Sequence, residues 1–399
     1  MGLSCAWYLQ EHGVEVTVLD ESGVAAGASW GNGGYLTPAL AVPLPEPALL
    51  REGLRGLLRT DAPVSIGRQL SLSTLAFLAR FTSRATTQRW RRGMAALTPL
   101  CLDALAAFDE LERGGVEATT HQGPITFGFE TERELESLEH ELRGVRQAGQ
   151  EVSLSRLPSR VAPMSDRLAF AARMSGQRYL DPGVYAHQLA CSVLRRGGRL
   201  EVGRRARARS VDVESGGVRV ETWMDRTYTA DAVVLATGVA LPALARRYGV
   251  RMPMQAGRGY SFSVSTTEPL QGPLYLQGVR GALTPLDNGR VRVAGSMEIA
   301  GHDAPPDPTR IDAIVRTLRP YVDGVDWDDI QDRWVGSRPL TTDGLPLIGR
   351  TRASGVYVAG GHGMWGLTLG PVTGKLLASQ VVTGDTPEAL QPFNPLRAG

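Results

Sequence analysis

The first twenty residues carry the pattern that most restricts the fold of this chain. Gly2 opens a segment in which apolar residues recur at helical spacing from Leu3, and Gly13 stands where a helix-ending glycine is common. The alternating residues 14–20 then predict a strand that ends at Asp20. A helix opened by glycine, followed by a strand that ends in an acid, is the second half of a dinucleotide-binding βαβ unit.

Each end of this unit has a predicted role. The amides at the helix start would approach a pyrophosphate at Gly2, and the Asp20 carboxylate would accept hydrogen bonds from ribose hydroxyls. The first strand of the unit and the first two glycines of its fingerprint do not precede Gly2. We therefore expect a truncated N-terminus that weakens folding and nucleotide retention, since each unpaired buried backbone group costs about 1–3 kcal/mol. The alternative is an ordinary amphipathic helix followed by a strand with an exposed acid.

Composition excludes several classes of protein. A chain of 399 residues with 42% hydrophobic and 21% charged residues is typical of a soluble globular protein with two domains. The net charge of +2 gives no electrostatic reason to bind nucleic acid. No run of apolar residues is long enough for a transmembrane segment. The cysteines, Cys5, Cys101 and Cys191, are too widely separated to suggest a metal site or a disulfide framework, so we expect no metal and a reducing compartment.

Segments with different patterns alternate along the chain. Residues 48–165 are predicted to be mainly helical, Asp181 is predicted to cap a helix, and residues 250–335 alternate as in antiparallel strands. The last block returns to the strand–loop–helix pattern. We therefore predict an α/β fold in which a Rossmann-like domain without its first strand is joined to a discontinuous α+β domain built on an antiparallel sheet. The predicted boundaries are 1–47, 166–240 and 336–399 for the first domain, and 48–165 and 241–335 for the second.

Two further segments resemble nucleotide-binding loops. A buried strand ends in Ala236-Thr237-Gly238, where bulk would clash with phosphates, although a buried strand with a glycine turn is the alternative. The strand 356–359 leads into a glycine loop and then a helix whose first turn contains Pro371. A helix N-terminus with amides exposed by glycine can stabilise negative charge on a ligand.

Together these motifs resemble one family over nearly the whole chain. They comprise the loop 28–38 (ASWGNGGYLTP), the segment 257–261 (GRGYS), Ala236-Thr237-Gly238, the block 338–344 (RPLTTDG) and the glycine loop 361–366 (GHGMWG). The chain is similar to the D-amino-acid oxidase superfamily of FAD-dependent oxidoreductases, and within it to the bacterial D-amino-acid dehydrogenases.

The resemblance implies roles for individual residues. Arg338 matches the arginine that clamps the substrate carboxylate, and Tyr260 matches a hydroxyl donor to the same carboxylate or a wall of the pocket. A surface salt bridge for Arg338 and a buried structural role for Tyr260 are the alternatives. FAD would be non-covalent, because residues 28–37 contain neither His nor Cys. The implied cofactor-binding residues are Gly2, Asp20, Gly33, Gly34, Tyr35, Ala236, Thr237, Gly238, Gly361, His362, Gly363, Gly366, Leu367 and Thr368.

The resemblance also implies an activity. The chain would deaminate D-amino acids oxidatively to 2-oxo acids and ammonia, with hydride transfer from Cα to flavin N5 and electrons passed to an acceptor other than O2, such as a quinone. A glycine or sarcosine oxidase and a hydroxy-D-proline dehydrogenase are alternatives within the enzyme class. A catalytically inactive paralogue or partner subunit is the alternative outside it. We expect a cytoplasmic location, with peripheral attachment to the inner face of the membrane left open.

Overall fold

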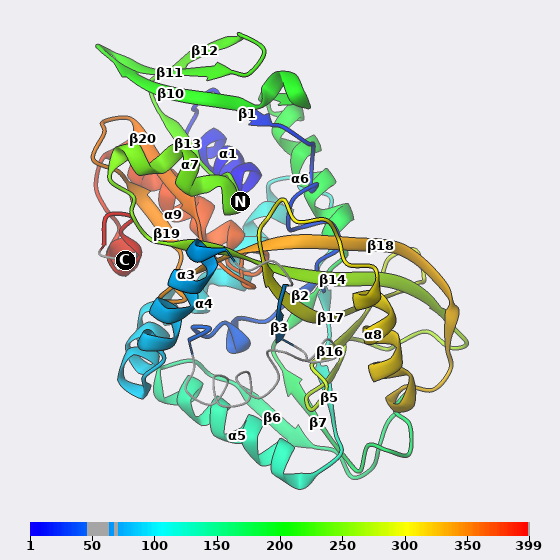
Figure 1. Cartoon of the computed structure of the whole chain (residues 1–399). Helices are drawn as coiled ribbons and strands as arrows, with labels where there is room; N and C mark the ends of the chain where they lie inside the picture. Colours follow the sequence, from blue (N-terminus) through cyan, green and yellow to red (C-terminus); the bar gives the residue numbers. More distant parts are fainter. Residues whose placement is uncertain (46–63, 68–70, 398–399) are drawn as a thin grey trace.

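The chain combines short parallel sheets with one large antiparallel sheet (Figure 1). The computed structural model describes residues 1–45, 64–67 and 71–397. In these ranges no helix is both long enough and apolar enough to cross a bilayer. The mixed architecture confirms the predicted α/β class, with a Rossmann-like part and an antiparallel part.

The Rossmann-like part contains two separate parallel strand pairs. One pair lies in a two-stranded sheet and the other in a three-stranded sheet that β19 completes, and no described strand is hydrogen-bonded to both sheets. Its strands are β1 (Thr17–Asp20), β9 (Arg199–Val202), β13 (Val233–Leu235), β19 (Leu347–Arg350) and β20 (Val356–Gly360). Its helices are α1 (Gly2–Glu11), α6 (Pro182–Arg195), α7 (Leu241–Ala245) and α9 (Gly370–Thr383).

Helices α1 and α9 pass so closely that a side chain would not fit between them. A Cβ on Gly374 would lie 2.7 Å from the backbone carbonyl of Ser4, well inside van der Waals contact. Trp7 of α1 is 1% exposed and donates its indole N–H to the Ser192 hydroxyl of α6 at 3.1 Å. This packing fixes the N-terminus of α1 relative to the glycine loop that precedes α9.

The large sheet has nine described strands, most of which lie in the predicted second domain. Its order is β18-β14-β17-β16-β15-β5-β7-β6, with β3 paired to β17, and only the β15–β5 and β17–β3 pairs are parallel. The strands are β3 (Val64–Ile66), β5 (Ile125–Phe129), β6 (Ser153–Arg156), β7 (Phe170–Ser175), β14 (Met254–Thr266), β15 (Leu274–Leu276), β16 (Gly281–Pro285), β17 (Val291–Ala300) and β18 (Val325–Thr341).

The remaining elements cover these sheets or extend from them. The helices are α3 (Leu72–Arg84), α4 (Thr87–Arg113), α5 (Glu132–Gln147) and α8 (Thr309–Leu318), with short 3-10 turns η1 (Pro38–Leu40), η2 (Arg204–Ala206), η3 (Gly238–Ala240), η4 (Arg246–Tyr248), η5 (Arg319–Tyr321) and η6 (Glu388–Phe393). Two three-stranded sheets are formed by β2 (Tyr35–Leu36), β4 (His121–Gln122) and β8 (Arg178–Tyr179), and by β10 (Ala208–Glu214), β11 (Gly217–Thr222) and β12 (Thr227–Ala230).

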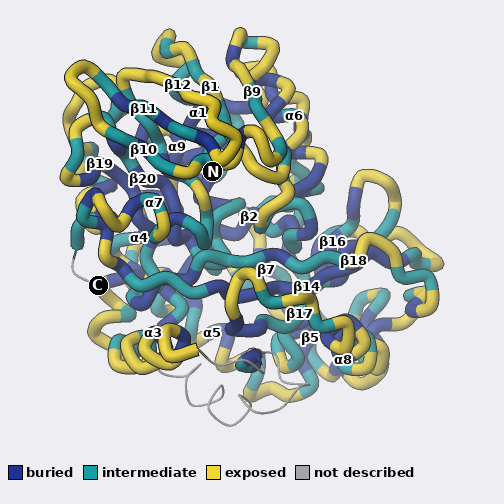
Figure 2. The backbone as a smooth tube through the Cα atoms, turned by 45° about the horizontal axis from the view of Figure 1, so that its top comes forward, coloured by how far each residue is buried: buried dark blue, intermediate teal, exposed yellow. Residues whose placement is uncertain are grey.

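The two faces of the nine-stranded sheet have different neighbours. Helix α8 packs on one face over a buried core that includes Phe262 and Leu283, and we call this the α8 face. The other face carries Arg338 and is covered in part by the loop 31–36, and we call it the Arg338 face. Figure 2 shows β14 and β17 as largely buried between these layers.

Several predicted elements match the structure, and some do not. The helix after Asp181 is confirmed, because the Asp181 carboxylate accepts the backbone N–H of Gly183 at 2.9 Å. Residues 48–165 contain the strands β5 and β6 as well as helices, and α8 lies within the predicted antiparallel block 250–335, so both descriptions were too simple. The predicted boundary at 47/48 lies outside the described residues, and β18 runs without interruption through position 336.

Candidate active site

Arg338 lies above a surface that glycine keeps open. It sits in β18 opposite Gly257 of β14, and the next pair on that face is Gly336 with Gly259. A Cβ on Gly259 would lie only 2.3 Å from Nη2 of Arg338, so the guanidinium occupies the space where a side chain would otherwise stand. The strand pairing and the missing side chain at 259 together position this cation.

The Arg338 guanidinium has no anionic partner in the described part of the chain, where no hydrogen bond or ion pair to it is found. Burial lowers its pKa to about 10, an effect that the nearby Tyr275 hydroxyl opposes. The group is therefore still charged at neutral pH. Arg338 is half-buried, and a cation that loses water without gaining an anionic partner is unfavourable. This position therefore favours an anionic ligand, and a planar guanidinium suits a carboxylate with two parallel hydrogen bonds.

The loop that carries Gly33 and Gly34 lies against the same face of the sheet. The hydroxyl groups of Ser261 and Thr284 donate to the carbonyls of Gly31 and Gly33 at 2.6 and 2.5 Å. Gly34 has a φ of +73°, and a Cβ there would lie 2.3 Å from the Leu180 carbonyl. Only glycine therefore fits at position 34, and the loop is held beside the surface that presents Arg338.

Tyr35 joins this loop to the second glycine loop. Its hydroxyl donates to the Leu274 carbonyl at 2.8 Å, and its own carbonyl accepts the Thr368 hydroxyl at 3.1 Å. The structure thus brings together Tyr35 and Thr368, two residues of the predicted cofactor-binding set. Leu367 is half-buried against the α1 core, on the helix side of the same loop.

The glycine loop before α9 is tied directly to the strand of Arg338. Gly363 donates its backbone N–H to the Pro339 carbonyl at 3.0 Å, one residue beyond Arg338. Gly361 and Gly363 have φ values of +75° and +56°, and a Cβ on Gly361 would lie 2.8 Å from the Thr341 methyl group. Gly366 lies against the Cβ of His362. The loop and the strand that carries Arg338 therefore form one connected structure.

His362 is buried within this loop, and its imidazole contacts α9. It is 5% exposed, and its Nε2 lies 3.0 Å from the Thr373 hydroxyl in α9. Burial lowers the pKa of His362 to about 3. The imidazole is therefore neutral at neutral pH, which fits a structural role in the loop.

The N-terminal half motif meets the Ala236-Thr237-Gly238 turn. A Cβ on Gly2 would stand 3.6 Å from the Ala236 Cβ, and no side chain caps the start of α1, so its first amides stay available to an anion. Thr237 is exposed, and Gly238 has a φ of +55°. The Asp20 carboxylate uses Oδ1 to accept the amides of Ser22 and Gly23, each at 2.9 Å. Its Oδ2 has no hydrogen-bond partner among the described residues.

The structure does not bring Tyr260 to Arg338, so the expected shared contact with a carboxylate is wrong. Residues 257 and 259 face Arg338, and Tyr260 therefore points to the α8 face. There its hydroxyl donates to Glu298 Oε2 at 2.8 Å and accepts the Asp307 amide at 3.2 Å. Tyr260 is 2% exposed within the α8-face core, which makes it a structural residue.

Tyr275 is the residue that sequence reasoning missed. It is half-buried in β15, and its ring packs edge-on against that of Phe127, with 5.8 Å between the ring centroids. It also interacts electrostatically with Arg338 and with the Tyr35 hydroxyl. No hydrogen bond to its hydroxyl occurs within the described ranges. Burial raises the Tyr275 pKa more than the positive charges of Arg280 and Arg338 lower it, so the hydroxyl stays protonated and able to donate. A tyrosine in a short apolar strand gives no sequence signal of this placement.

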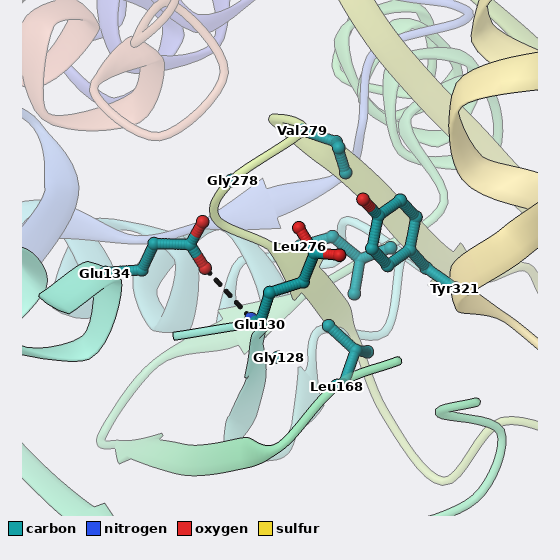
Figure 3. A pocket seen from close by; sticks show the side chains of 8 residues that line it. All are labelled: Gly128, Glu130, Glu134, Leu168, Leu276, Gly278, Val279 and Tyr321. Carbon is teal, nitrogen blue, oxygen red and sulfur yellow. Dashed lines mark hydrogen bonds between the residues drawn. The ribbon is translucent and has the colours of Figure 1, made fainter. Parts of the chain in front are cut away.

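A separate small pocket lies beside the ends of β5 and β15 in the large sheet (Figure 3). Glu130, Glu134 and Tyr321 supply its polar groups, and Glu134 accepts the Glu130 amide at 2.9 Å. None of the predicted site residues lines this pocket. We therefore assign the candidate site to the Arg338 face and not to this hollow.

Known proteins match this chain over nearly its full length. Residues 1–380 match the DAO family, described as FAD dependent oxidoreductase. A D-amino acid dehydrogenase of Cereibacter sphaeroides is 27% identical, with 97% of this chain and 91% of that protein covered. Glycine oxidase from Geobacillus kaustophilus has a similar fold, with a TM-score of 0.73, 20% identity, and coverage of 100% and 96%. L-Amino acid deaminase from Proteus vulgaris, lacking its specific insertion, has a TM-score of 0.69, 16% identity, and coverage of 99% and 91%.

The two glycine loops and the uncapped start of α1 fit the cofactor that this match implies. Positive φ values at Gly34, Gly361 and Gly363 open backbone surfaces that a flat ring can approach, and free helix amides suit a pyrophosphate. The chain belongs to the FAD-dependent oxidoreductase family, and FAD is its cofactor.

Proposed function

We propose that this protein is a D-amino-acid dehydrogenase. The substrate loses a hydride from Cα and a proton from nitrogen, and the resulting imino acid is hydrolysed to a 2-oxo acid and ammonia. FAD, when bound, supplies the hydride acceptor. The observation that carries the proposal is the unpaired Arg338 guanidinium beside both glycine loops, and the relative named D-amino acid dehydrogenase supports the substrate class.

Arg338 holds the substrate carboxylate in this proposal. Two parallel N–H···O bonds fix the plane of the carboxylate, so the direction of Cα–H is also restricted. We propose that the Tyr275 hydroxyl donates a further hydrogen bond to the same carboxylate. Tyr275 pairs with Ala282 and Ala282 with Ala294, which faces Gly33, so Tyr275 shares the Arg338 face of the sheet. Gly259 leaves the space that the guanidinium requires.

The cofactor would be held without a covalent bond. Gly2, Ala236, Thr237 and Gly238 face its phosphates in this proposal, and Asp20 faces a ribose through its free Oδ2. The glycine loops surround the ring. Their members are Gly33, Gly34, Tyr35, Gly361, His362, Gly363, Gly366, Leu367 and Thr368. The buried hydrogen bond of His362 with Thr373 supports a non-covalent site, because it leaves this imidazole engaged with the protein.

Anaerobic reduction of the flavin tests the substrate class. Purified protein loaded with FAD is mixed without oxygen with D-amino acids, their L-enantiomers, glycine, sarcosine and hydroxy-D-proline, and flavin absorbance is followed. The proposal predicts bleaching by D-amino acids and little by L-enantiomers. Bleaching by glycine or sarcosine alone, or by hydroxy-D-proline alone, contradicts it in favour of those activities. No bleaching by any compound, with FAD bound, indicates an inactive paralogue.

The acceptor is tested by reoxidation. We propose that electrons pass to a quinone, and that the protein works in the cytoplasm at the inner face of the membrane. Reduced protein should then return to the oxidised form faster with a soluble quinone analogue than with air-saturated buffer. Rapid peroxide formation in air with no gain from the quinone contradicts this and indicates an oxidase.

A further inference from the structure

Helix α3 carries apolar residues on two opposite sides. Phe77 faces inward at 2% exposed and stacks on Phe81 at 5.7 Å. The outer side repeats apolar residues at i, i+3, i+4 and i+7, all of them exposed, namely Leu72, Leu75, Ala76 and Ala79. Leu72 is 86% exposed and Leu75 is 47% exposed, and Figure 2 shows the outer side of α3 as exposed. Exposed leucines aligned on one side of a helix favour contact with a second apolar environment.

The same part of the chain has an unusual charge. Residues 63–102 contain six arginines and no acidic residue, although the whole chain has 43 basic and 41 acidic residues. Arg84 is 3.8 Å from Asp343. Arg80 of α3 and Arg91 and Arg92 in the first turns of α4 are exposed, and in the described ranges none of the three forms an ion pair. The outer apolar stripe is thus accompanied by positive charge that no acidic side chain of the described residues pairs with.

We propose that α3 and the start of α4 dock on an anionic lipid bilayer. Leu72 and Leu75 would enter the boundary between headgroups and acyl chains, and Arg80, Arg91 and Arg92 would contact anionic headgroups. An apolar stripe alone would also suit a protein partner. The run of arginines without acids favours an anionic surface, to which each arginine near the bilayer adds attraction.

This surface lies beside the strands of the candidate active site. The Thr74 hydroxyl of α3 donates to the Gln255 side chain of β14 at 3.2 Å. Gln255 is four residues along β14 from Gly259, a span of roughly 13 Å for an extended strand. Docking at α3 would therefore bring the Arg338 face near the membrane. The docking surface follows from exposure and charge alone. Its use for passing electrons to a quinone in that bilayer rests on the proposed function.

Vesicle co-sedimentation of FAD-loaded protein tests the surface. The vesicles contain equal parts phosphatidylcholine and phosphatidylglycerol, with pure phosphatidylcholine for comparison. We expect binding to the anionic vesicles that weakens as salt is raised. The triple variant Arg80→Gln, Arg91→Gln and Arg92→Gln should bind about 100-fold more weakly. The double variant Leu72→Gln and Leu75→Gln should bind about tenfold more weakly, because less apolar surface enters the bilayer.

Matched controls separate this surface from general effects. Arg204, Arg205 and Arg246 are also exposed, and a triple Gln variant there should bind as wild type does. Equal binding by wild type and the α3 double variant, or no binding by wild type, overturns the proposal. A wild-type dimer that the Leu72 and Leu75 changes convert to monomer overturns it too, because the face would then join two copies.

Flavin reduction by a soluble substrate is measured in parallel. Vesicle binding without substrate activity rejects the proposed function and leaves the surface standing.

Discussion

Two arginines on neighbouring strands of one sheet have opposite surroundings. Arg258 of β14 points to the α8 face, where it lies 3.6 Å from Glu298 and donates to the Pro305 carbonyl at 3.1 Å. Arg338 of β18 points to the other face and has no anion beside it in the described structure. Arg258 is 3% exposed and Arg338 is half-buried, and partial loss of water lowers the pKa of Arg338. A cation supplied with its own anion serves the fold, whereas a cation without one is available to a ligand.

The comparison predicts opposite consequences of the same substitution on the two faces. Losing Arg258 leaves the buried Glu298 carboxylate with weaker compensation, from the Tyr260 hydroxyl and the more distant Arg310, and so reduces stability. Losing the unpaired Arg338 should not lower the free energy of unfolding, and should weaken only ligand binding.

Arg338→Gln should abolish most activity with little change in stability. We expect kcat/KM for the best D-amino acid to fall about 1000-fold, equivalent to about 4 kcal/mol, because a buried charged contact to the substrate is lost. FAD content and melting temperature should match the wild type. Arg338→Lys should recover only part of the activity, since lysine cannot form the paired hydrogen bonds. A kcat/KM unchanged in Arg338→Gln refutes the role.

Arg258→Gln should instead destabilise the protein, by about 1–3 kcal/mol, because Glu298 loses one buried cation and keeps only Tyr260 at 2.8 Å and the more distant Arg310 at 3.9 Å. Chemical denaturation measures this as a lower free energy of unfolding. The double variant Arg258→Gln with Glu298→Gln should regain part of that loss. If Arg258→Gln raised KM as much as Arg338→Gln with no loss of stability, the distinction between the faces would fail.

Gly259→Ala should displace the Arg338 guanidinium, since its Cβ would lie 2.3 Å from Nη2. A shift of about 1 Å in a positioning group can lower activity about 100-fold. We expect KM to rise more than kcat falls. Gly257→Ala is the matched control on the same face, because its Cβ would meet Leu340 and Met297 and not the guanidinium. Equal effects of the two substitutions on KM would show that crowding of the strand, and not Arg338, is responsible.

The affinity for a carboxylate should decrease at high pH. Arg338 binds the anion only when protonated, and its pKa is about 10. Binding is therefore complete below this pKa, and it should fall about tenfold per pH unit above it. An inhibitor without an amine, such as benzoate, avoids titration of the ligand in this range, and flavin absorbance reports its dissociation constant. A dissociation constant that stays level to well above pH 10 argues against binding at Arg338.

Tyr275→Phe should raise KM about fivefold, the effect of losing one hydrogen bond to a charged group. Tyr260→Phe provides the contrast, because it removes the hydroxyl that donates to Glu298 and should lower stability without raising KM. The pair is compared by steady-state kinetics and thermal unfolding. A KM increase in Tyr260→Phe alone would reverse our assignment of the two tyrosines.

Much of the fold could be predicted from the sequence because the signals were local. Asp181 predicted a capped helix, and the alternation within residues 250–335 predicted antiparallel strands, which the pairing of β16 with β17 confirms. The glycine loops were recognised from their motifs. Helix α8 was missed, because its short amphipathic pattern lies inside a block dominated by strands.

The assignment of faces could not be predicted in the same way. The segment 257–261 shows by alternation that Arg258 and Tyr260 share one face and that the glycines share the other. The resemblance to the family predicted Tyr260 as a site residue. In the structure the glycine side, and not the Tyr260 side, faces Arg338 of β18 and Tyr275 of β15. Which distant strand covers a face depends on sheet order, which no local pattern specifies.

A crystal structure of the FAD-loaded protein with benzoate or another carboxylate inhibitor tests the central claim most directly. Our account predicts the carboxylate within hydrogen-bonding distance of both Arg338 Nη atoms, above Gly259 and beside the Tyr275 hydroxyl, with the Arg258–Glu298 pair unchanged. A carboxylate bound elsewhere, with Arg338 paired to an acidic side chain of the protein, would contradict it.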